Sequence, residues 1–128
     1  MRTIRFRGKC LGTGEWIYGS LLQEKINGAT TECIIVDLGY ARDRKQIQVN
    51  TAGQFTGLLD GDGNEIYEGD ILGISNDPYF LPEIVIYAEG CFMAKDDYTT
   101  VPISAVDTHC RTVVGNIHDN PELCQLPR

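Results

Sequence analysis

Short runs in which apolar and polar residues alternate are spread along most of the chain. Thr3–Gly8 and Glu15–Gln23 both place apolar side chains at every second position, which is the pattern of a strand with one buried face. Because only a turn-like segment separates these two runs, we expect them to form a hairpin. Alternation, or a short continuous apolar run, predicts further strands at Cys33–Leu38, Gln46–Val49, Gln54–Leu59, Glu65–Tyr67, Asp70–Ile74, Glu83–Tyr87, Cys91–Lys95, Val101–Val106 and Thr112–Ile117.

A loop of glycine and acidic residues, Asp60–Asn64, lies near the centre of the chain. It separates two strand-like arms, and its residues tolerate the positive φ that tight hairpin turns require. Asp62-Gly63 is the expected core of this turn, so Gly63 is predicted to have a positive φ. Asn27-Gly28 and Glu89-Gly90 are expected to form two other tight turns.

No long stretch of the sequence shows helical periodicity. A turn of helix is allowed only at Gln23–Thr31 and at Pro121–Leu126, where Asn120 is the expected N-cap and proline stands at the first helical position. The polar, basic segment Gly39–Lys45 and the proline-containing segment Ser75–Pro82 are expected to be loops.

These elements predict a mostly β fold with little helix. We expect an N-terminal β-meander and, from Ile71 onward, a small barrel similar to an SH3-like barrel. One domain is expected over residues 1–128, and lobes at 1–53 and 54–128 are allowed. The apolar sides of the alternating runs predict the buried residues Phe6, Trp16, Tyr18, Phe55, Ile71, Val85, Val114 and Ile117.

The composition indicates a folded domain in a reducing compartment. The chain has 128 residues, 42% of them hydrophobic, which is enough for a core. No apolar run approaches the roughly 20 residues of a membrane helix, and the N-terminal sequence lacks the apolar region of a secretory signal. The five cysteines are odd in number and include no C-x-x-C pair. Free thiols and a cytoplasmic location are therefore expected.

The net charge of −7 is unevenly distributed. Residues 1–45 hold eight basic and five acidic residues, a net +3, whereas residues 46–128 hold three basic and thirteen acidic residues, a net −10. Either the two halves attract each other, within a chain or between subunits, or the basic half binds nucleic acid. We favour attraction because the chain as a whole is acidic. The second hypothesis would rest on Arg5, Arg7, Lys9, Arg42, Arg44 and Lys45.

Candidate metal ligands fail on their spacing. Asp60, Asp62 and Asn64 resemble the start of an EF-hand calcium loop, but Glu65 stands where that loop needs glycine and Ile71 where it needs glutamate. A hairpin turn is the better interpretation. His109 and Cys110 would point to opposite faces of a strand and could not chelate a metal together.

Candidate catalytic groups are equally few. Neither a G-x-S-x-G motif nor a phosphate-binding loop is present. Glu65, Glu68 and Asp70 lie close in sequence and could do acid–base chemistry, but carboxylates beside a turn more often cap it. We assign no catalytic, metal or cofactor site.

Three blocks of the sequence resemble the YopX family, small proteins of bacteriophages and prophages. The blocks are MRTIRFRGKCLGTGEWIYGSLLQ, QFTGLLDGDGNEIYEGDIL and VVGNIHDNPEL, which occur in the expected order and cover about half of the chain. The resemblance implies a β-rich fold and a phage context. It supplies no catalytic residue, because the family has no assigned activity. The turn departs from the family pattern, which often has Lys/Asn-Gly-Lys where this chain has Gly-Asp-Gly-Asn.

We therefore expect a non-enzymatic, protein-binding accessory protein of a phage or prophage. Its partner would be a host or phage protein in the bacterial cytoplasm, and a homo-oligomer is allowed. A nucleic-acid-binding module that uses the basic N-terminal face is the alternative. A small enzyme with an unrecognised carboxylate site is the second alternative. No cofactor is expected, and membranes and nucleic acids are not expected partners.

Overall fold

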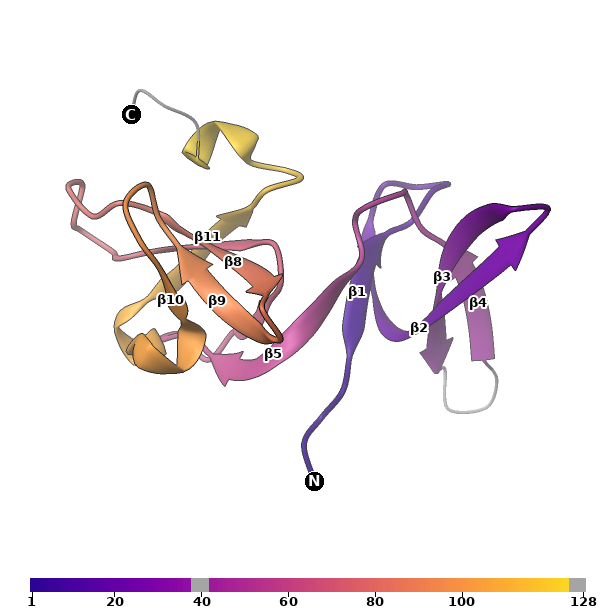
Figure 1. Ribbon diagram of the computed structural model, residues 1–128, viewed down its shortest axis with the longest axis horizontal. Helices are drawn as coiled ribbons and strands as arrows, with labels where there is room; N and C mark the ends of the chain where they lie inside the picture. The colour runs from indigo at the N-terminus through magenta and orange to yellow at the C-terminus, as the bar shows by residue number, and fades with distance from the viewer. Residues whose placement is uncertain (38–41, 125–128) are drawn as a thin grey trace. The chain divides into compact units, whose positions relative to one another are not determined.

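The computed structural model describes residues 1–37 and 42–124, and antiparallel strands make up most of it (Figure 1). The predicted mostly β fold with little helix is confirmed: the described residues form no α-helix and only short 3₁₀ turns. The chain divides into two compact units, Met1–Phe55 and Thr56–Arg128.

The first unit holds most of a sheet whose strands run in the order β4-β3-β2-β1-β5-β6. The strand β5 crosses the boundary between the units, and β6 belongs to the second unit. The strands up to this boundary are β1 (Phe6–Lys9), β2 (Trp16–Ile26), β3 (Ala29–Asp37), β4 (Arg42–Gln46) and β5 (Gly53–Leu59).

Two hairpins form the centre of this sheet. The predicted pairing of the first two strands is confirmed, and β2 continues past β1 into a longer hairpin with β3, in which Ile26 lies opposite Ala29. Asn27 and Gly28 connect them with φ of 51° and 82°, as a type I′ turn requires. The segment Gln23–Thr31 is therefore strand and turn, and the helical turn allowed there is wrong.

A bridge between Cys10 and Ile47 ties the end of β1 to the residue that follows β4. The N–H of Leu11 donates to the carbonyl of Gln46 at 2.9 Å beside this bridge. Gly8 also lies against Ile47, so closely that a Cβ at Gly8 would stand 2.5 Å from a side-chain carbon of Ile47. The buried hydrophobic residues of this unit are Cys10, Cys33, Ile34, Ile47 and Phe55.

The loop predicted at Gly39–Lys45 is wrong for residues 42–45, which belong to the strand β4. Arg42–Lys45 pairs with β3, while residues 39–41 lie outside the described part of the chain. Its charged sequence hid it from a search for apolar alternation, because an edge strand needs no buried face and is often charged. The strand predicted at Gln46–Val49 shrinks to Gln46, the last residue of β4, and the Ile47 bridge.

The second unit contains an antiparallel sheet in the order β10-β9-β8-β7-β11. The hairpin predicted to turn at Glu89-Gly90 is confirmed as β8 and β9. Its buried core centres on Ile66, Leu72 and Val85. The elements are β6 (Glu65–Tyr67), β7 (Asp70–Gly73), β8 (Glu83–Ala88), β9 (Cys91–Lys95), β10 (Thr100–Pro102), β11 (Thr112–Asn116) and the 3₁₀ turns η1 (Ile103–Ala105), η2 (Thr108–Cys110) and η3 (Pro121–Cys124).

This five-stranded sheet does not close into the predicted SH3-like barrel, because β10 and β11 are its two edges. The strand predicted at Val101–Val106 ends after Pro102, where η1 begins. At the opposite edge, side chains of Asp60 and Asn120 accept hydrogen bonds from backbone N–H groups of β11. The β11 edge is therefore engaged by side chains and does not pair with β10.

The predicted core is right in part. Phe55, Ile71 and Val85 are buried, Phe6 and Trp16 are half-buried, and Tyr18, Val114 and Ile117 are exposed by 45%, 47% and 36%. The pairing of β11 with β7 shifts register between Val113 and Gly115, and such an irregularity re-aims a side chain. This accounts for the outward position of Val114.

Candidate functional site

Two of the candidate basic residues contact Trp16. Arg7 and Lys9 lie on the same face of β1, and in the pairing with β2 Lys9 lies opposite Trp16. The guanidinium carbon of Arg7 is 4.6 Å and the ammonium nitrogen of Lys9 is 5.9 Å from the centre of the Trp16 ring, which are cation–π distances. Arg7 is only 6% exposed. Arg5 is exposed, and the side chain of Arg42 lies outside the described residues.

The other two candidates form ion pairs within their own unit. Arg44 contacts Glu24, and Nζ of Lys45 lies 3.0 Å from Oδ2 of Asp43, a hydrogen bond that raises the pKa of Lys45. Arg44 and Lys45 are neighbours in a strand, so they point to opposite faces of the sheet. Four of the six candidate basic residues are thus divided between a contact with Trp16 and surface ion pairs.

The carboxylate of Asp60 organises the central turn. Its Oδ1 accepts the backbone N–H groups of Asp62 at 2.9 Å and Asn64 at 2.8 Å, and its Oδ2 accepts the N–H of Val113 at 2.9 Å. Burial alone would raise the pKa of Asp60, but these hydrogen bonds, from Val113, Asn64 and Asp62, outweigh burial and lower the pKa below its usual 3.8. Asp60 therefore joins the turn to β11.

Both oxygens of Asp60 are thus occupied by hydrogen-bond donors, so the D-x-D-x-N sequence is arranged as a turn and not as a calcium loop. Within residues 1–37 and 42–124, no group of three or more His, Cys, Asp and Glu side chains is placed to hold a metal ion. Gly63 has a φ of 83°, as predicted. At Gly61 a Cβ would stand 2.5 Å from the carbonyl oxygen of His109, so the turn lies directly against η2.

The acidic residues after the turn also hold backbone in place. Oδ2 of Asp70 accepts the N–H of Tyr67 at 2.7 Å, and the Tyr67 hydroxyl donates to Oε1 of Glu65 at 2.9 Å. Asp70 is 1% exposed. Two of the three carboxylates considered for acid–base chemistry therefore stabilise β6 and the turn that joins it to β7.

The segment Asn116–Asn120, near the C-terminus, is also a turn that side-chain oxygens stabilise. Oδ1 of Asn116 accepts the N–H groups of His118 and Asp119 at 3.0 and 2.9 Å, and Oδ1 of Asn120 accepts the N–H of Asn116 at 3.2 Å. A Cβ at Gly115 would stand 2.4 Å from Oδ1 of Asn120. The turn of helix predicted at Pro121–Leu126 is present as η3 over Pro121–Cys124, and residues 125 and 126 lie outside the described part of the chain.

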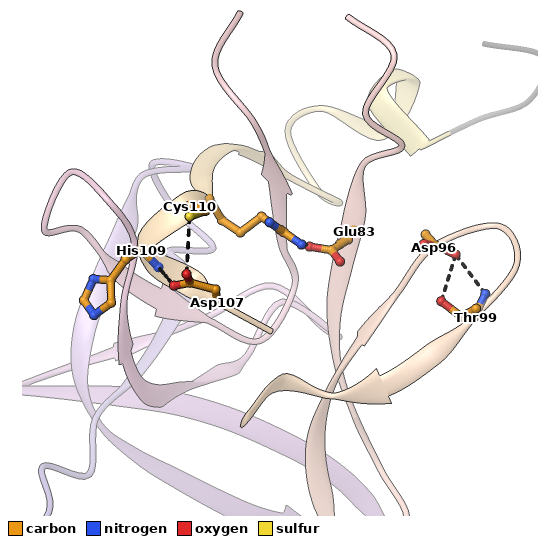
Figure 2. Close-up of polar contacts among 7 residues, drawn as sticks. Glu83, Asp96, Thr99, Asp107, His109 and Cys110 are labelled. Atoms are coloured by element: carbon orange, nitrogen blue, oxygen red, sulfur yellow. Dashed lines mark hydrogen bonds and ion pairs between the residues drawn. The ribbon is translucent and has the colours of Figure 1, made fainter. Parts of the chain in front are cut away.

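Asp107, His109 and Cys110 bring catalytic residue types together at η2, but not in a catalytic arrangement. Asp107 accepts the backbone N–H of His109 at 3.1 Å, and Sγ of Cys110 lies 3.3 Å from its Oδ2. The imidazole ring of His109 points away from Cys110 (Figure 2). The hydrogen bond to Asp107 and its charge raise the pKa of the Cys110 thiol, which disfavours the nucleophilic thiolate.

Two further contacts drawn in Figure 2 also hold the fold of the second unit. Nε of Arg111 lies 2.8 Å from Oε1 of Glu83, and both side chains are mostly buried. The Arg111 guanidinium also lies 4.7 Å from the centre of the Phe80 ring. Oδ1 of Asp96 accepts the backbone N–H of Thr99 at 2.8 Å, which closes the turn between β9 and β10.

All five cysteines are free thiols in the structure. Cys10 is buried and its pKa is lowered, first by a hydrogen bond from the Thr13 side chain and then by backbone N–H groups of Thr13 and Gly12. The thiol at the start of this turn therefore acts as an acceptor within it.

A pocket of about 270 Å³ lies beside β3 in the first unit. Ile47, which is 2% exposed, and Val49, which is 78% exposed, give it apolar surface. Glu32, Asn50 and Thr30 add polar groups to its lining.

The edge of β3 at this pocket has backbone groups that no described strand pairs with. The carbonyl of Glu32 accepts the N–H of Ile47 at 3.0 Å, so the backbone groups of Glu32 point away from β2. Because this direction alternates along an antiparallel strand, those of Thr30 point the same way. Pairing with β4 stops at Cys33, opposite Gln46. An extended segment could therefore continue the sheet beside Thr30.

The sequence analysis missed this open edge. The Asn27-Gly28 dipeptide lies between residues that suit strands, which is a signal for a hairpin. What the pattern did not show is that β3, with nine residues, extends beyond β4, with five.

The chain belongs to the YopX family: a family model described as YopX protein matches residues 5–125. The crystal structure of protein EF1440 from Enterococcus faecalis has the same fold, with a TM-score of 0.59 and 23% sequence identity over 98% of this chain and 100% of that chain. No curated protein matches the sequence. Among the described residues, no helix has the length and apolar character needed to span a membrane.

Proposed function

We propose that this chain is a non-enzymatic accessory protein of a phage or prophage that binds a host or phage protein in the bacterial cytoplasm. The observation that carries the proposal is the open edge of β3 beside the pocket. An extended segment of a partner adds to such an edge as an extra strand, held by main-chain hydrogen bonds, while a pocket selects its side chains.

The chemistry of the edge indicates the segment that it would accept. The N–H and C=O of Thr30 supply the main-chain donor and acceptor. The apolar surface of Ile47 and Val49 suits an apolar side chain. Glu32, whose carboxylate accepts a hydrogen bond from the neutral amide of Gln23 at 2.7 Å, favours a basic residue at the margin of the pocket.

The two alternatives receive less support. A nucleic-acid module needs exposed, clustered cations, yet Arg7 is buried against Trp16 and Arg44 and Lys45 contact carboxylates. An enzyme needs ionisable groups directed into a cavity. Asp60 and Asp70 instead accept backbone hydrogen bonds in turns.

Affinity capture from infected or lysogenic cells, followed by mass spectrometry, tests the proposal when wild type and two Thr30 variants are compared. Thr30→Pro removes the outward N–H, and proline is tolerated at a strand edge. Thr30→Val keeps the N–H and serves as the matched control. We expect one partner to be retained by wild type and Thr30→Val and lost from Thr30→Pro.

A partner retained equally by all three proteins would contradict strand addition at β3. Retention of nucleic acid alone would favour the first alternative. The Thr30→Pro protein must keep the wild-type far-UV circular dichroism spectrum, since the comparison requires a folded variant.

A further inference from the structure

We propose that two copies of this chain pair through the outer edge of β2, at Leu21–Lys25, to form one continuous antiparallel sheet. This edge lies on the opposite side of the β2–β3 hairpin from the pocket. The inference therefore does not depend on the proposed function, and the two fail separately.

The direction of the β2 backbone groups follows from two observed contacts. The carbonyl of Glu15 accepts the N–H of Cys10 at 2.8 Å, so odd-numbered residues of β2 turn their backbone groups away from β3. Ile26 and Ala29 flank the two-residue turn. In such hairpins the two flanking residues form a hydrogen-bonded pair, so the even-numbered residues of β2 turn their backbone groups toward β3. The two contacts agree.

Leu21, Gln23 and Lys25 therefore present N–H and C=O groups on the side away from β3. The pairing of β1 with β2 ends at Phe6 opposite Gly19, and β2 then bends away from β1 (Figure 1). None of the described backbone hydrogen bonds reaches this stretch from outside the hairpin.

Two other sheet edges of the chain, β11 and β4, are protected. Side chains of Asp60 and Asn120 cover β11, and β4 carries the charges of Arg44 and Lys45. Natural edges are normally shielded in such ways, since an open edge is a template for another strand. The edge at Leu21–Lys25 has no proline and no described bulge.

Among the twofold pairings centred on Leu21, Gln23 or Lys25, one register fits this edge. If a twofold axis passes at Gln23, each Gln23 faces the other, and Leu21 of one copy faces Lys25 of the other. Leu21, Gln23 and Lys25 then each donate a backbone N–H to the partner strand and accept a hydrogen bond from it at the C=O. Leu22 faces Glu24, whose charge is already compensated by Arg44.

The neighbouring registers are disfavoured. Centring the pair on Lys25 sets two lysines directly opposite each other, and like charges in that position are destabilising. Centring the pair on Leu21 would require Gly19 to pair with Gln23 of the other copy, but Gly19 is already paired with Phe6. The sequence of the edge is thus complementary to itself at Gln23.

Sedimentation equilibrium over about 1–500 μM tests the dimer with variants at Gln23. Gln23→Pro removes an N–H that is not used within the hairpin, so the fold should tolerate it. Gln23→Ala removes the same side chain but keeps the N–H. We expect a concentration-dependent dimer whose Kd rises about tenfold or more in Gln23→Pro, equivalent to about 1.4 kcal/mol, and changes less than about threefold in Gln23→Ala.

Backbone hydrogen exchange followed by NMR provides a readout in the wild-type chain. The amides of Leu21, Gln23 and Lys25 should exchange more slowly as the concentration rises, while that of Thr30 stays unchanged. A monomer at every concentration would overturn the inference. So would a dimer that survives Gln23→Pro but is lost in Thr30→Pro, because that result would assign the interface to β3.

Discussion

Replacing the buried Asp60 by asparagine should destabilise the second unit strongly. The carboxylate accepts backbone N–H groups from Asp62, Asn64 and Val113. An asparagine can still offer one oxygen to Asp62 and Asn64, but its NH₂ group then meets the N–H of Val113. One hydrogen bond to a charged group is lost, worth about 1.5–3 kcal/mol, and a buried donor is left unsatisfied at a cost of about 1–3 kcal/mol.

We therefore expect Asp60→Asn to reduce the free energy of unfolding by about 3 kcal/mol or more. Urea denaturation followed by far-UV circular dichroism measures this loss. Trp16 is the single tryptophan and lies in the first unit, so its fluorescence reports separately on that unit. Hydrogen exchange of the β7–β9 amides should show which unit has been loosened.

Asp62→Asn is the matched control, because Asp62 is exposed in the same turn and such surface changes usually stay within about 0.5 kcal/mol. A loss below about 1 kcal/mol for Asp60→Asn would refute the reasoning. The pH dependence gives a second check. The pKa of Asp60 is lowered in the folded state, so its stabilisation is complete above the unfolded pKa of about 3.9 and disappears as the pH falls through the folded value. Asp60→Asn should lack that part of the acid sensitivity.

Three further outcomes are expected. Gly63→Val should cost about 1 kcal/mol or more, because β-branched residues resist positive φ, whereas Gly63→Asn should cost less; equal melting temperatures for wild type and Gly63→Val would contradict the assigned turn. Alkylation under denaturing, non-reducing conditions should label all five cysteines in the mass spectrum, and fewer labels would reveal a disulfide. Gel shifts at about 50 mM salt should show no micromolar binding to DNA or RNA; binding abolished by Arg5→Glu/Lys9→Glu, with the steep salt dependence of phosphate contacts, would restore the nucleic-acid hypothesis.

The hairpins were predictable because local signals specify them. Asn27-Gly28, Asp62-Gly63 and Glu89-Gly90 each lie between strand-forming runs, and all three positions turn where expected. Turn chemistry acts over a few residues, so it can be recognised without knowing the fold.

The solvent-facing parts were harder to predict. Alternation in β2 identifies two faces but not which face meets a core, and Tyr18 is exposed as a result. The charged β4 has no apolar alternation to detect, because it is an edge strand and residues 44–46 are exposed to water. The carboxylate of Asp60 was assigned to a turn, but its bond to Val113, 53 residues away, has no local signal in the sequence.

The bond from Val113 to Asp60 also affects how the protein is made. The strands β1 to β4 and the hairpins that they form lie within Met1–Phe55, so this part of the first unit can fold while the ribosome is still producing the rest. Domains commonly fold in this order during synthesis. The second unit cannot complete its fold so early, because β7 pairs with β11. The hydrogen bond from Val113 to Asp60 in the central turn also forms only when Val113 has left the ribosome. During that interval the nascent chain exposes the edge of β7, and a translational pause before residue 112 would prolong its exposure to chaperones and proteases.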